Sequence, residues 1–385
     1  MKKKVLFVVD ERMMGGVSIL LSDILNRINI KKYNIDVLVL HNHGDYLNDL
    51  PSDVNVIYGT KFFNMVDYNI KEALKTFNPL KIFSKLRLVY LMKRKKIGQR
   101  IIKERKKILN KTYDVEVAFK DGFCALFTAY GDSKKKYHWL HSDYAMYDCT
   151  ANYYPLFKEI FPKFDKIIGI SNGVLERFQN KYDVHNTEVI MNIIDKEKLI
   201  RMGNDEKVSF SKDKINLISV GRIHNMKGYD RLVDVLAELD KNGHLENVIT
   251  RIIGDGPDFD LVKKKINDYN LSKKVLLMGR KRNPYPYVKE SDCFLMCSRY
   301  EPFGLVILES MILGTPVLSL DVASIKEIMS EEYGMIYENS RDGLYEGILN
   351  IINNPSILNK YKKALKKYDY SINKILKQIE ELLDE

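Results

Sequence analysis

Hydrophobic positions in this chain fall into two alternating patterns. Short apolar runs bounded by polar residues predict buried strands, and stretches whose apolar residues recur every three or four positions predict amphipathic helices. Strands that alternate with helices form parallel sheets with crossover helices, so the pattern predicts an α/β protein. The predicted strands are 5–9, 36–41, 54–58, 115–119, 137–140, 166–170 and 187–190 in the first half, and 215–220, 248–253, 275–278, 293–297, 316–320 and 335–338 in the second.

The length of 385 residues predicts two domains, because one ordinary hydrophobic core rarely extends over so long a chain. Residues 195–214, rich in Lys, Asp and Ser, interrupt the alternation and indicate a linker. We therefore expect a first domain over 1–195, a second over 196–368 and a terminal helix over 369–385 that crosses back to the first domain. Two open α/β domains facing across a cleft would bind ligands at the carboxyl ends of their strands.

The segment around Gly304 is the most informative motif. The predicted strand 293–297 runs into Glu301-Pro302-Phe303-Gly304, and helical spacing begins directly afterwards. The free N–H groups and positive dipole end of such a helix suit an anion such as a nucleoside diphosphate. Glu301 and Glu309 are acceptors when ionised, so beside phosphates they suit neutral hydroxyls, which a nucleotide sugar offers on both ribose and hexose.

Two cations follow the predicted strand 215–220. Arg222 and Lys227 lie in a glycine turn before a new helical pattern, and together they could neutralise a diphosphate leaving group without a metal. The alternative is that both are ordinary surface cations of a loop. Neither the segment around Arg222 nor the segment around Gly304 contains an Asp-x-Asp metal motif, which favours transfer without a metal or other cofactor.

The net charge of +11 is concentrated in one segment. Residues 81–111 contain thirteen Lys or Arg and one acid, Glu104, so this segment alone carries +12. Apolar residues recur at helical spacing from Ile97 to Leu109, and a basic amphipathic helix suits an anionic membrane surface. The alternative is a solvated helix whose apolar stripe packs on its own domain. Nucleic-acid binding is disfavoured, because no aromatic residues interleave the basic run from 93 to 111.

The four cysteines are few and scattered, which fits a reducing cytoplasm better than a disulfide framework. Cys293 and Cys297 have no nearby His pair, so buried thiols are favoured over a zinc site. No apolar run is long enough to span a membrane, and Lys2-Lys3-Lys4 leads directly into a predicted strand. We expect a protein that neither spans a membrane nor is secreted.

Several motifs together resemble one family. The sequence resembles the family-4 retaining glycosyltransferases of the GT-B fold, also described as glycosyl transferases group 1. In the second half the resemblance is carried by Gly221-Arg222, Lys227-Gly228, Gly254-Asp255-Gly256-Pro257, Glu301-Pro302-Phe303-Gly304, Glu309 and Gly314-Thr315-Pro316-Val317. In the first half it is carried by Gly15-Gly16-Val17, the segment from His138 to Asp143, Ser171, and Asn192 with Asp195.

The resemblance implies a role for each of these second-half positions. Arg222 and Lys227 would hold the donor diphosphate, and Glu301 would contact the transferred sugar. Glu309 would accept hydrogen bonds from the ribose hydroxyls. Backbone groups at the start of the helix would complete the cradle around phosphate and sugar, namely those of Phe303, Gly304 and Leu305.

In the first half, Gly15 and Gly16 would let a loop approach the same phosphates closely, because glycine has no side chain to obstruct them. His141 would lie across the cleft near the anomeric carbon. His138 is the alternative, although it falls within the predicted strand, and Asp143 is a third polar group there. Where the family has Asn-Gly before the linker Asp, this chain has Asn192-Ile193-Ile194-Asp195, which removes a flexible glycine.

The resemblance and the residues together predict a retaining glycosyltransferase that needs no metal. It would move a hexose from a nucleoside diphosphate sugar, with a UDP-sugar as the expected donor, to a lipid-linked or polysaccharide acceptor. The basic segment 81–111 places it at the cytoplasmic face of the plasma membrane as a peripheral protein. One rival is a sugar-nucleotide epimerase on the same scaffold, and another is a sugar-nucleotide-binding protein without catalysis.

Overall fold

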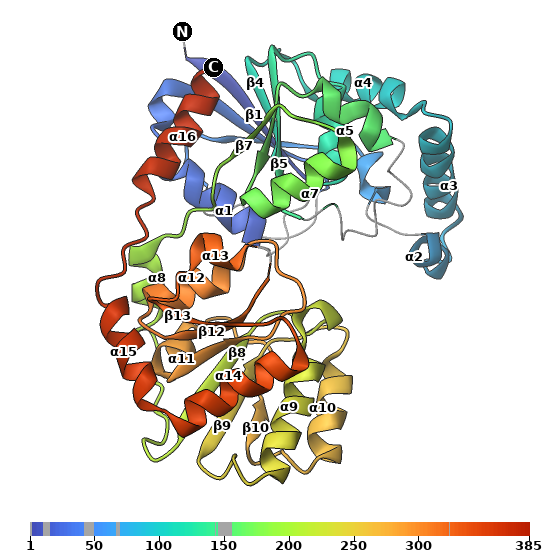
Figure 1. Cartoon of the computed structure of the whole chain (residues 1–385). Coiled ribbons are helices and arrows are strands. Elements are labelled where there is room, and N and C mark those ends of the chain that lie inside the picture. The colour runs from blue at the N-terminus through green and yellow to red at the C-terminus, as the bar shows by residue number, and fades with distance from the viewer. Residues whose placement is uncertain are drawn as a thin grey trace. The chain divides into compact units, whose positions relative to one another are not determined.

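The computed structural model describes residues 2–10, 16–41, 50–66, 70–142, 144, 156–322 and 324–385. The chain divides into two compact units, one formed by Met1–Ile193 with Ile372–Glu385 and the other by Ile194–Ser371. Each unit contains one parallel sheet with helices interleaved between its strands (Figure 1). The predicted α/β class is therefore confirmed.

The first unit is built on a seven-stranded parallel sheet in the order β3-β2-β1-β4-β5-β6-β7. Sequence order reverses between β1 and its neighbour β4, which makes the carboxyl ends of these two strands a topological switch point. The strands are β1 (Lys3–Val9), β2 (Tyr33–Val39), β3 (Asn55–Tyr58), β4 (Val115–Ala118), β5 (Lys135–Leu140), β6 (Lys166–Gly169) and β7 (Thr187–Val189).

Helices of the first unit include one from the far end of the chain. The helices that lie between its strands in sequence are α1 (Gly16–Leu25), α2 (Ile70–Lys75), α3 (Pro79–Lys93), α4 (Ile97–Ile108), α5 (Phe123–Ala129) and α7 (Asn172–Tyr182). The last helix, α16 (Asn373–Asp384), buries Ile375, Ile379, Leu382 and Leu383, and Glu380 pairs with Lys32 at 3.0 Å. The C-terminal helix is thus an integral part of the first unit.

The second unit repeats this plan with a six-stranded parallel sheet in the order β10-β9-β8-β11-β12-β13. Its switch point lies between β8 and β11. The strands are β8 (Ile215–Val220), β9 (Val248–Ile253), β10 (Val275–Leu277), β11 (Cys293–Met296), β12 (Val317–Leu320) and β13 (Gly334–Tyr337). The helices are α8 (Lys196–Met202), α9 (Tyr229–Lys241), α10 (Phe259–Asp268), α11 (Tyr285–Glu290), α12 (Leu305–Ile312), α13 (Ile325–Ile328), α14 (Arg341–Asn353) and α15 (Ser356–Leu365).

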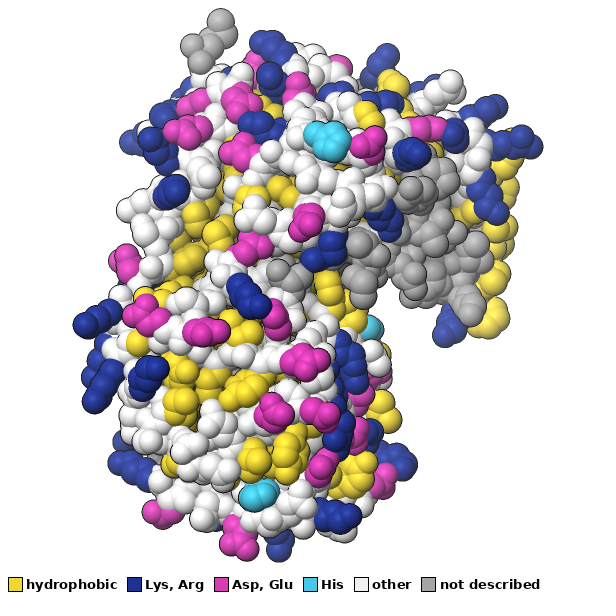
Figure 2. Space-filling view, in the orientation of Figure 1, with side chains coloured by type: hydrophobic (Ala, Val, Ile, Leu, Met, Phe, Trp, Pro, Cys, Tyr) yellow, Lys and Arg dark blue, Asp and Glu magenta, His cyan; other side chains and the backbone are white. Residues whose placement is uncertain are grey.

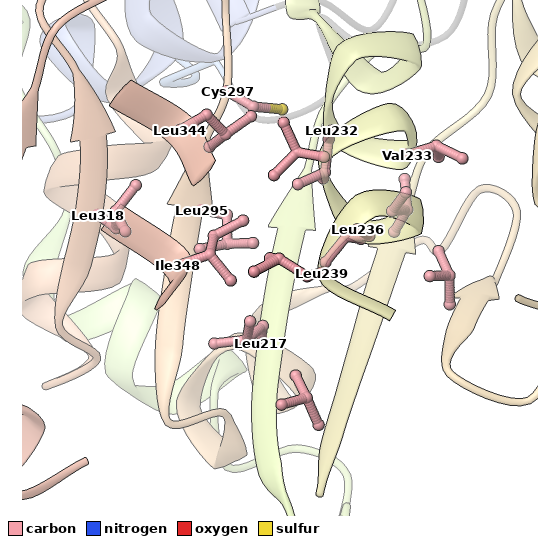
Figure 3. Close-up of a cluster of buried hydrophobic side chains, with 14 of the residues drawn as sticks. Leu217, Leu232, Val233, Leu236, Leu239, Leu295, Cys297, Leu318, Leu344 and Ile348 are labelled. Atoms are coloured by element: carbon pink, nitrogen blue, oxygen red, sulfur yellow. The ribbon is translucent and has the colours of Figure 1, made fainter. Parts of the chain in front are cut away.

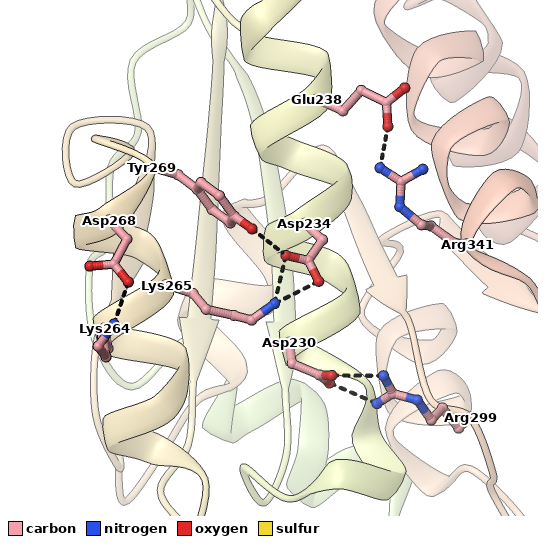
Figure 4. Close-up of polar contacts among 9 residues, drawn as sticks. All are labelled: Asp230, Asp234, Glu238, Lys264, Lys265, Asp268, Tyr269, Arg299 and Arg341. Carbon is pink, nitrogen blue, oxygen red and sulfur yellow. Dashed lines mark hydrogen bonds and ion pairs between the residues drawn. The ribbon is translucent and has the colours of Figure 1, made fainter.

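Helix α9 is held on both of its faces. Its apolar side packs against the sheet and α14 in a continuous buried cluster that includes Leu232, Leu236 and Leu239 (Figure 3). On its polar side, Asp230 binds Arg299 through two contacts of 2.7 Å, and Asp234 binds Lys265 at 2.6 Å (Figure 4). The start of α9, where the predicted phosphate-binding loop ends, is therefore fixed in the second unit.

All thirteen predicted strands are present, with ends within a few residues of the predicted ones. Two other expectations need correction. The segment 195–214, predicted as a linker, contains α8, whose first turn is capped by the Asp195 carboxylate accepting the Lys198 N–H at 2.9 Å. The basic segment is two helices, α3 and α4, rather than one, and the chain turns between them at Lys95 with φ +54°.

The apolar stripe of α4 packs inward, as the alternative interpretation of this segment holds. Ile97 and Ile101 are fully buried. Arg105 is also buried and binds Glu116 of β4 at 2.7 and 2.8 Å, so this cation stabilises the unit rather than charging its surface. Among the described helices, none combines the length and the apolar character needed to cross a membrane.

Candidate active site

The loop between β8 and α9 carries the two predicted phosphate-binding cations. It passes directly over the end of β11, where a Cβ added to Gly228 would lie 2.2 Å from the Cys297 carbonyl oxygen. Gly228 also has φ +70°, a conformation that favours glycine. These two constraints explain why a glycine stands between Lys227 and the first turn of α9.

The turn after β9 supports the same loop. A Cβ on Gly256 would lie 2.2 Å from the Ile223 carbonyl oxygen, and the Ile223 N–H donates to the Asp255 carbonyl oxygen at 2.9 Å. The Asp255 carboxylate accepts the Gly256 N–H at 2.7 Å, so this side chain shapes the turn. The glycine motif therefore supports the backbone next to Arg222.

The loop between β11 and α12 is tied to the β8–α9 loop. The Arg299 N–H donates to the Met226 carbonyl oxygen at 2.8 Å, and its guanidinium binds the Asn225 carbonyl oxygen and Asp230. Asn339, after β13, donates to the Arg299 carbonyl oxygen at 2.9 Å. Strands β8 and β11 are neighbours, so these contacts join the two loops at the switch point of the sheet.

Lys227 and Glu301 come together at this point. The Lys227 ammonium is bound to the Glu301 carboxylate, whose side chain is only 10 % exposed. Arg222 lies five residues before Lys227 with an exposed side chain, and no ion pair or hydrogen bond engages its guanidinium among the described residues. The structure thus supplies one paired and one unpaired cation in the same loop.

Helix α12 begins at the predicted glycine. Gly304 is the residue before the first turn and has φ +83°, while Phe303 is buried beside it. A helix start of this kind presents backbone N–H groups, including those of Leu305 and the residues after it, and the positive end of the helix dipole. Phe303, Gly304 and Leu305, which are predicted to hold phosphate and sugar, therefore stand at the start of a helix.

Glu309 lies on the same helix without a cationic partner among the described residues. The Tyr285 hydroxyl donates to its Oε1 at 3.1 Å. Burial raises the pKa of Glu309 to about 7, and the hydrogen bond from Tyr285 opposes this rise. Near neutral pH this carboxyl group can therefore lose or gain a proton, and its ionised form is an acceptor for hydroxyl groups.

In the first unit the structure distinguishes the two histidines. His138 of β5 is completely buried, with Nδ1 at 3.3 Å from the Ala118 carbonyl oxygen and Nε2 at 3.3 Å from the Tyr144 hydroxyl. It also stacks on Phe161 at an interplanar angle of 11°. Both ring nitrogens of His138 are thus engaged within the unit, which supports a structural role for this residue.

His141 follows the end of β5 and is different. Its Nε2 is shielded from solvent and has no hydrogen-bond partner in the described part of the chain, while its ring stacks on Trp139 at an interplanar angle of 5°. Burial lowers the pKa of His141 to about 3, so the imidazole is neutral at physiological pH. Of the two histidines, His141 is the one that keeps a ring nitrogen without a hydrogen-bond partner among the described residues.

Sequence reasoning missed Asp121, which lies in the loop after β4. Its Oδ2 accepts the His141 N–H at 3.3 Å, and its Oδ1 lies 3.7 Å from His138 Nε2. Burial raises the pKa of this carboxyl group to about 7. A polar residue directly after a buried strand was the available signal. Lys120, beside it, pairs with Asp10 at the end of β1.

The remaining first-half predictions are only partly described. Gly16 is the first residue of α1, which follows β1 at the switch point of the first sheet. Gly15 and Asp143 lie outside the described residues.

Cys293 and Cys297 are free and buried, Cys124 is buried, and Cys149 falls outside the described residues. In the described ranges no three His, Cys, Asp or Glu side chains are grouped closely enough to hold a metal ion.

Comparison with known proteins identifies the second unit. Residues 202–370 match the family described as Glycosyl transferases group 1. A Campylobacter jejuni relative, N-acetylgalactosamine-N,N'-diacetylbacillosaminyl-diphospho-undecaprenol 4-alpha-N-acetylgalactosaminyltransferase, is 27 % identical over 221 residues, which cover 56 % of this chain and 58 % of the relative. The chain spans 58 % of the length of this relative and 55 % of that of a Methanocaldococcus jannaschii relative, and less than half of the length of several others.

Solved structures match over almost the whole chain. Sucrose-phosphate synthase from Thermosynechococcus elongatus has a TM-score of 0.72 at 17 % identity and covers 100 % of this chain and 98 % of its own. The Anabaena protein HepE in complex with UDP and glucose has a TM-score of 0.67 at 19 % identity, with 99 % of both chains covered. At this level of identity the similarity concerns the fold.

The class of protein follows from these observations. The chain has the GT-B glycosyltransferase fold. Residues 202–370, which make up most of its second unit, match glycosyl transferases group 1, so the resemblance to that group is confirmed there.

Proposed function

We propose that this protein transfers a sugar from a nucleoside diphosphate donor, a UDP-sugar, to a lipid-linked or polysaccharide acceptor, with retention of the anomeric configuration. The observation that carries the proposal is the arrangement at the β8/β11 switch point. There Arg222 and Lys227 share one loop, and Glu301 and Glu309 flank the start of α12. Cations for a diphosphate thus lie beside acceptors for hydroxyl groups.

The proposed roles follow from the chemistry of these groups. Arg222 offers an unpaired forked guanidinium for phosphate oxygens, and Lys227 adds a compact charge once a donor competes for its contact with Glu301. Glu301 then accepts from a sugar hydroxyl and Glu309 from the ribose. The N–H groups at the start of α12 complete the stabilisation of the leaving diphosphate, so no metal is required.

Retention is proposed to occur by front-face substitution. The bond from the anomeric carbon to the diphosphate oxygen breaks as the acceptor oxygen approaches from the same face, and a departing phosphate oxygen takes the acceptor proton. No protein nucleophile takes part in this route, so the residues supply position and charge. In the first unit, His141 offers the neutral Nε2 acceptor for a sugar hydroxyl.

The names of relatives support a lipid-linked acceptor. The Campylobacter relative is named for a diphospho-undecaprenol acceptor, and a Rhizobium meliloti relative is named as a lipopolysaccharide core biosynthesis glycosyltransferase. UDP is named in the complex of the Anabaena structure. These names favour a UDP-sugar and a lipid-linked acceptor for this chain as well.

Membrane contact is proposed through α3 rather than through α4. Large apolar side chains lie exposed on one face of α3 at helical spacing, with Leu80 77 %, Phe83 65 % and Tyr90 54 % exposed. Figure 2 shows hydrophobic side chains along the edge of the first unit where α3 lies, with Lys and Arg beside them. From 73 to 103 the sequence has ten Lys or Arg and no acid, although Lys85 is buried. This combination suits an anionic lipid surface.

The proposal is tested with a panel of nucleotide sugars and a polyprenyl diphosphate-linked acceptor. A transferase releases nucleoside diphosphate and glycosylates the acceptor only when both substrates are present. An epimerase converts the donor sugar without any acceptor, and a binding protein is protected against heat by a nucleotide sugar without converting it. Either of these last two results contradicts the proposal.

A further inference from the structure

Tyr285 and Glu309 form a contact that the roles above do not use. Tyr285 is the first residue of α11, and its hydroxyl donates to Glu309 Oε1 at 3.1 Å. The other carboxylate oxygen, Oε2, has no hydrogen bond among the described residues, and Glu309 is half-buried rather than completely enclosed. One oxygen of Glu309 is therefore anchored and the other is available to a ligand.

Tyr285 is itself held in place from two sides. Its backbone N–H donates to Asn283 Oδ1 at 3.2 Å, and Asn283 Nδ2 donates to the Met202 carbonyl oxygen at the end of α8 at 2.8 Å. Pro284 and Pro286 flank Tyr285, and each proline fixes its own φ. The phenol is thus attached to a restrained stretch of backbone.

We propose that Tyr285 is a positioning residue, which anchors Glu309 Oε1 so that Oε2 accepts hydrogen bonds from the vicinal hydroxyls of a ribose. This inference rests on the proposed nucleotide site and adds a determinant of its selectivity for ribose over deoxyribose. A carboxylate that is already oriented loses less freedom when it binds a ligand than one that is free to rotate.

In the described part of the chain, no ion pair joins Glu309 to a charged group of the neighbouring elements. Helix α12 packs against α8, β11 and β12. On α8, Lys196 pairs with Asp369, Lys198 is half-buried, and Glu197 and Arg201 are exposed. The thiols of β11 and the residue after it are buried with raised pKa values, so they are neutral. The pKa of Glu309 is set by burial, which raises it, and by the Tyr285 hydrogen bond, which lowers it.

The chain offers a matched control two residues further along α11. The Tyr287 hydroxyl also donates to a carboxylate, Glu206 Oε1 at 3.3 Å, which is remote in sequence from Glu309. Tyr285→Phe and Tyr287→Phe therefore remove the same atom from the same helix. Only the first substitution removes a hydrogen bond to Glu309.

Two measurements on the full chain test the proposal. In the protein without ligand, the Glu309 carboxyl carbon is titrated by NMR with ¹³C-labelled glutamate, and its signal is assigned by its loss in Glu309→Gln. Binding of UDP and of 2'-deoxy-UDP is then compared by calorimetry. We expect Tyr285→Phe to raise the pKa of Glu309 and to reduce the preference for UDP over 2'-deoxy-UDP about tenfold. Tyr287→Phe should leave the pKa of Glu309 and this preference unchanged.

The outcomes separate this inference from the proposed function. If the pKa of Glu309 is unchanged in Tyr285→Phe, the hydrogen bond between Tyr285 and Glu309 is disproved, regardless of the binding measurements. A shifted titration with an undiminished preference for UDP overturns the positioning role. If the wild-type protein binds neither nucleotide, the proposed function fails, and with it the assignment of ribose as the ligand of Glu309.

Discussion

Arg222 is the residue whose effect on turnover can be separated most cleanly from folding. Its side chain is exposed, so Arg222→Ala removes no ion pair or side-chain hydrogen bond among the described residues. We expect turnover to fall by about 10²-fold or more, because a preorganised charge at the leaving group is lost. The measurement is the rate of transfer at saturating donor.

The control for this substitution is Lys263→Ala, which removes an exposed cation from α10 in the same unit. It should transfer sugar at the wild-type rate. Equal rates for Arg222→Ala and the wild-type protein, with unfolding curves that coincide, would remove Arg222 from the site.

The raised pKa of Glu309 predicts a pH dependence of nucleotide binding. Its pKa is about 7, and the ionised form is the acceptor for ribose hydroxyls. The competent fraction therefore falls as the pH decreases through 7, and the dissociation constant for UDP should rise about tenfold for each unit below the pKa. Calorimetry between pH 6 and pH 8 measures this change.

Glu309→Gln is the control for the pH dependence, because UDP itself also titrates in this range. The ratio of the wild-type dissociation constant to that of Glu309→Gln should increase below pH 7. A ratio that stays constant from pH 6 to pH 8 would show that Glu309 does not take part in binding as a carboxylate.

At the scale of elements, the close packing of the β8–α9 loop against the end of β11 depends on Gly228. Gly228→Ala adds a Cβ at 2.2 Å from a backbone oxygen and forces alanine to adopt φ +70°. We expect the free energy of unfolding of the second unit to fall by about 2–4 kcal/mol, from the strained dihedral angle and the overpacking together. Urea unfolding monitored in the second unit measures this loss.

Gly243→Ala separates the two contributions. Gly243 has φ +78°, but a Cβ there would meet no atom within 4 Å. It should therefore cost only the dihedral strain, about 1–2 kcal/mol. If the two substitutions lower the free energy of unfolding equally, the close approach to β11 does not contribute to the loss.

The exposed face of α3 predicts membrane binding with two components. Replacing Leu80, Phe83 and Tyr90 with Ser should greatly reduce sedimentation with anionic vesicles, because the apolar face is lost while every charge remains. High salt should release only part of the wild-type protein, since screening weakens the attraction between charges but not apolar burial.

Leu261 and Tyr269, which are exposed on or beside α10, provide the matched control when replaced with Ser. This control should sediment as the wild-type protein does. Undiminished vesicle binding by the α3 variant would assign the contact to another surface.

The elements also show what the sequence could predict. Strands and the start of α12 follow from local periodicity and from Gly304, so they were found with ends within a few residues. Whether an apolar stripe is covered depends on residues remote in sequence. The apolar residues of α3 lie on all sides of the helix, and Leu88 and Met92 are buried while Leu80, Phe83 and Tyr90 are exposed. The sequence alone does not show which of these sides is covered.

Dependence on residues remote in sequence also limits the prediction of the site. Arg222, Lys227, Glu301 and Glu309 stand beside strand ends, where parallel sheets collect functional groups, and this could be inferred. The Lys227–Glu301 pair and the contact between Tyr285 and Glu309 join residues 74 and 24 positions apart in sequence. Such contacts arise only when the sheet brings separate loops together.

At the scale of the whole molecule, the same architecture occurs twice. Both units have parallel sheets whose order reverses beside the first strand, and polar groups follow the strands at each switch point. In the first unit these are Asp10, Lys120 and Asp121. In the second unit they are the loops that carry Arg222 and Glu301. We propose that the donor binds to the second unit, because among the described residues the cation Arg222 and the carboxyl groups of Glu301 and Glu309 stand there beside the start of a helix.

The measurement that tests the central claim most directly is sugar transfer from a UDP-sugar to a polyprenyl diphosphate-linked acceptor in the presence of a chelator, with the anomeric configuration of the product determined by NMR. The account predicts stoichiometric release of UDP, a product with the configuration of the donor, and a rate that the chelator leaves unchanged. Conversion of the donor without acceptor, an inverted product, or loss of activity with the chelator would contradict it.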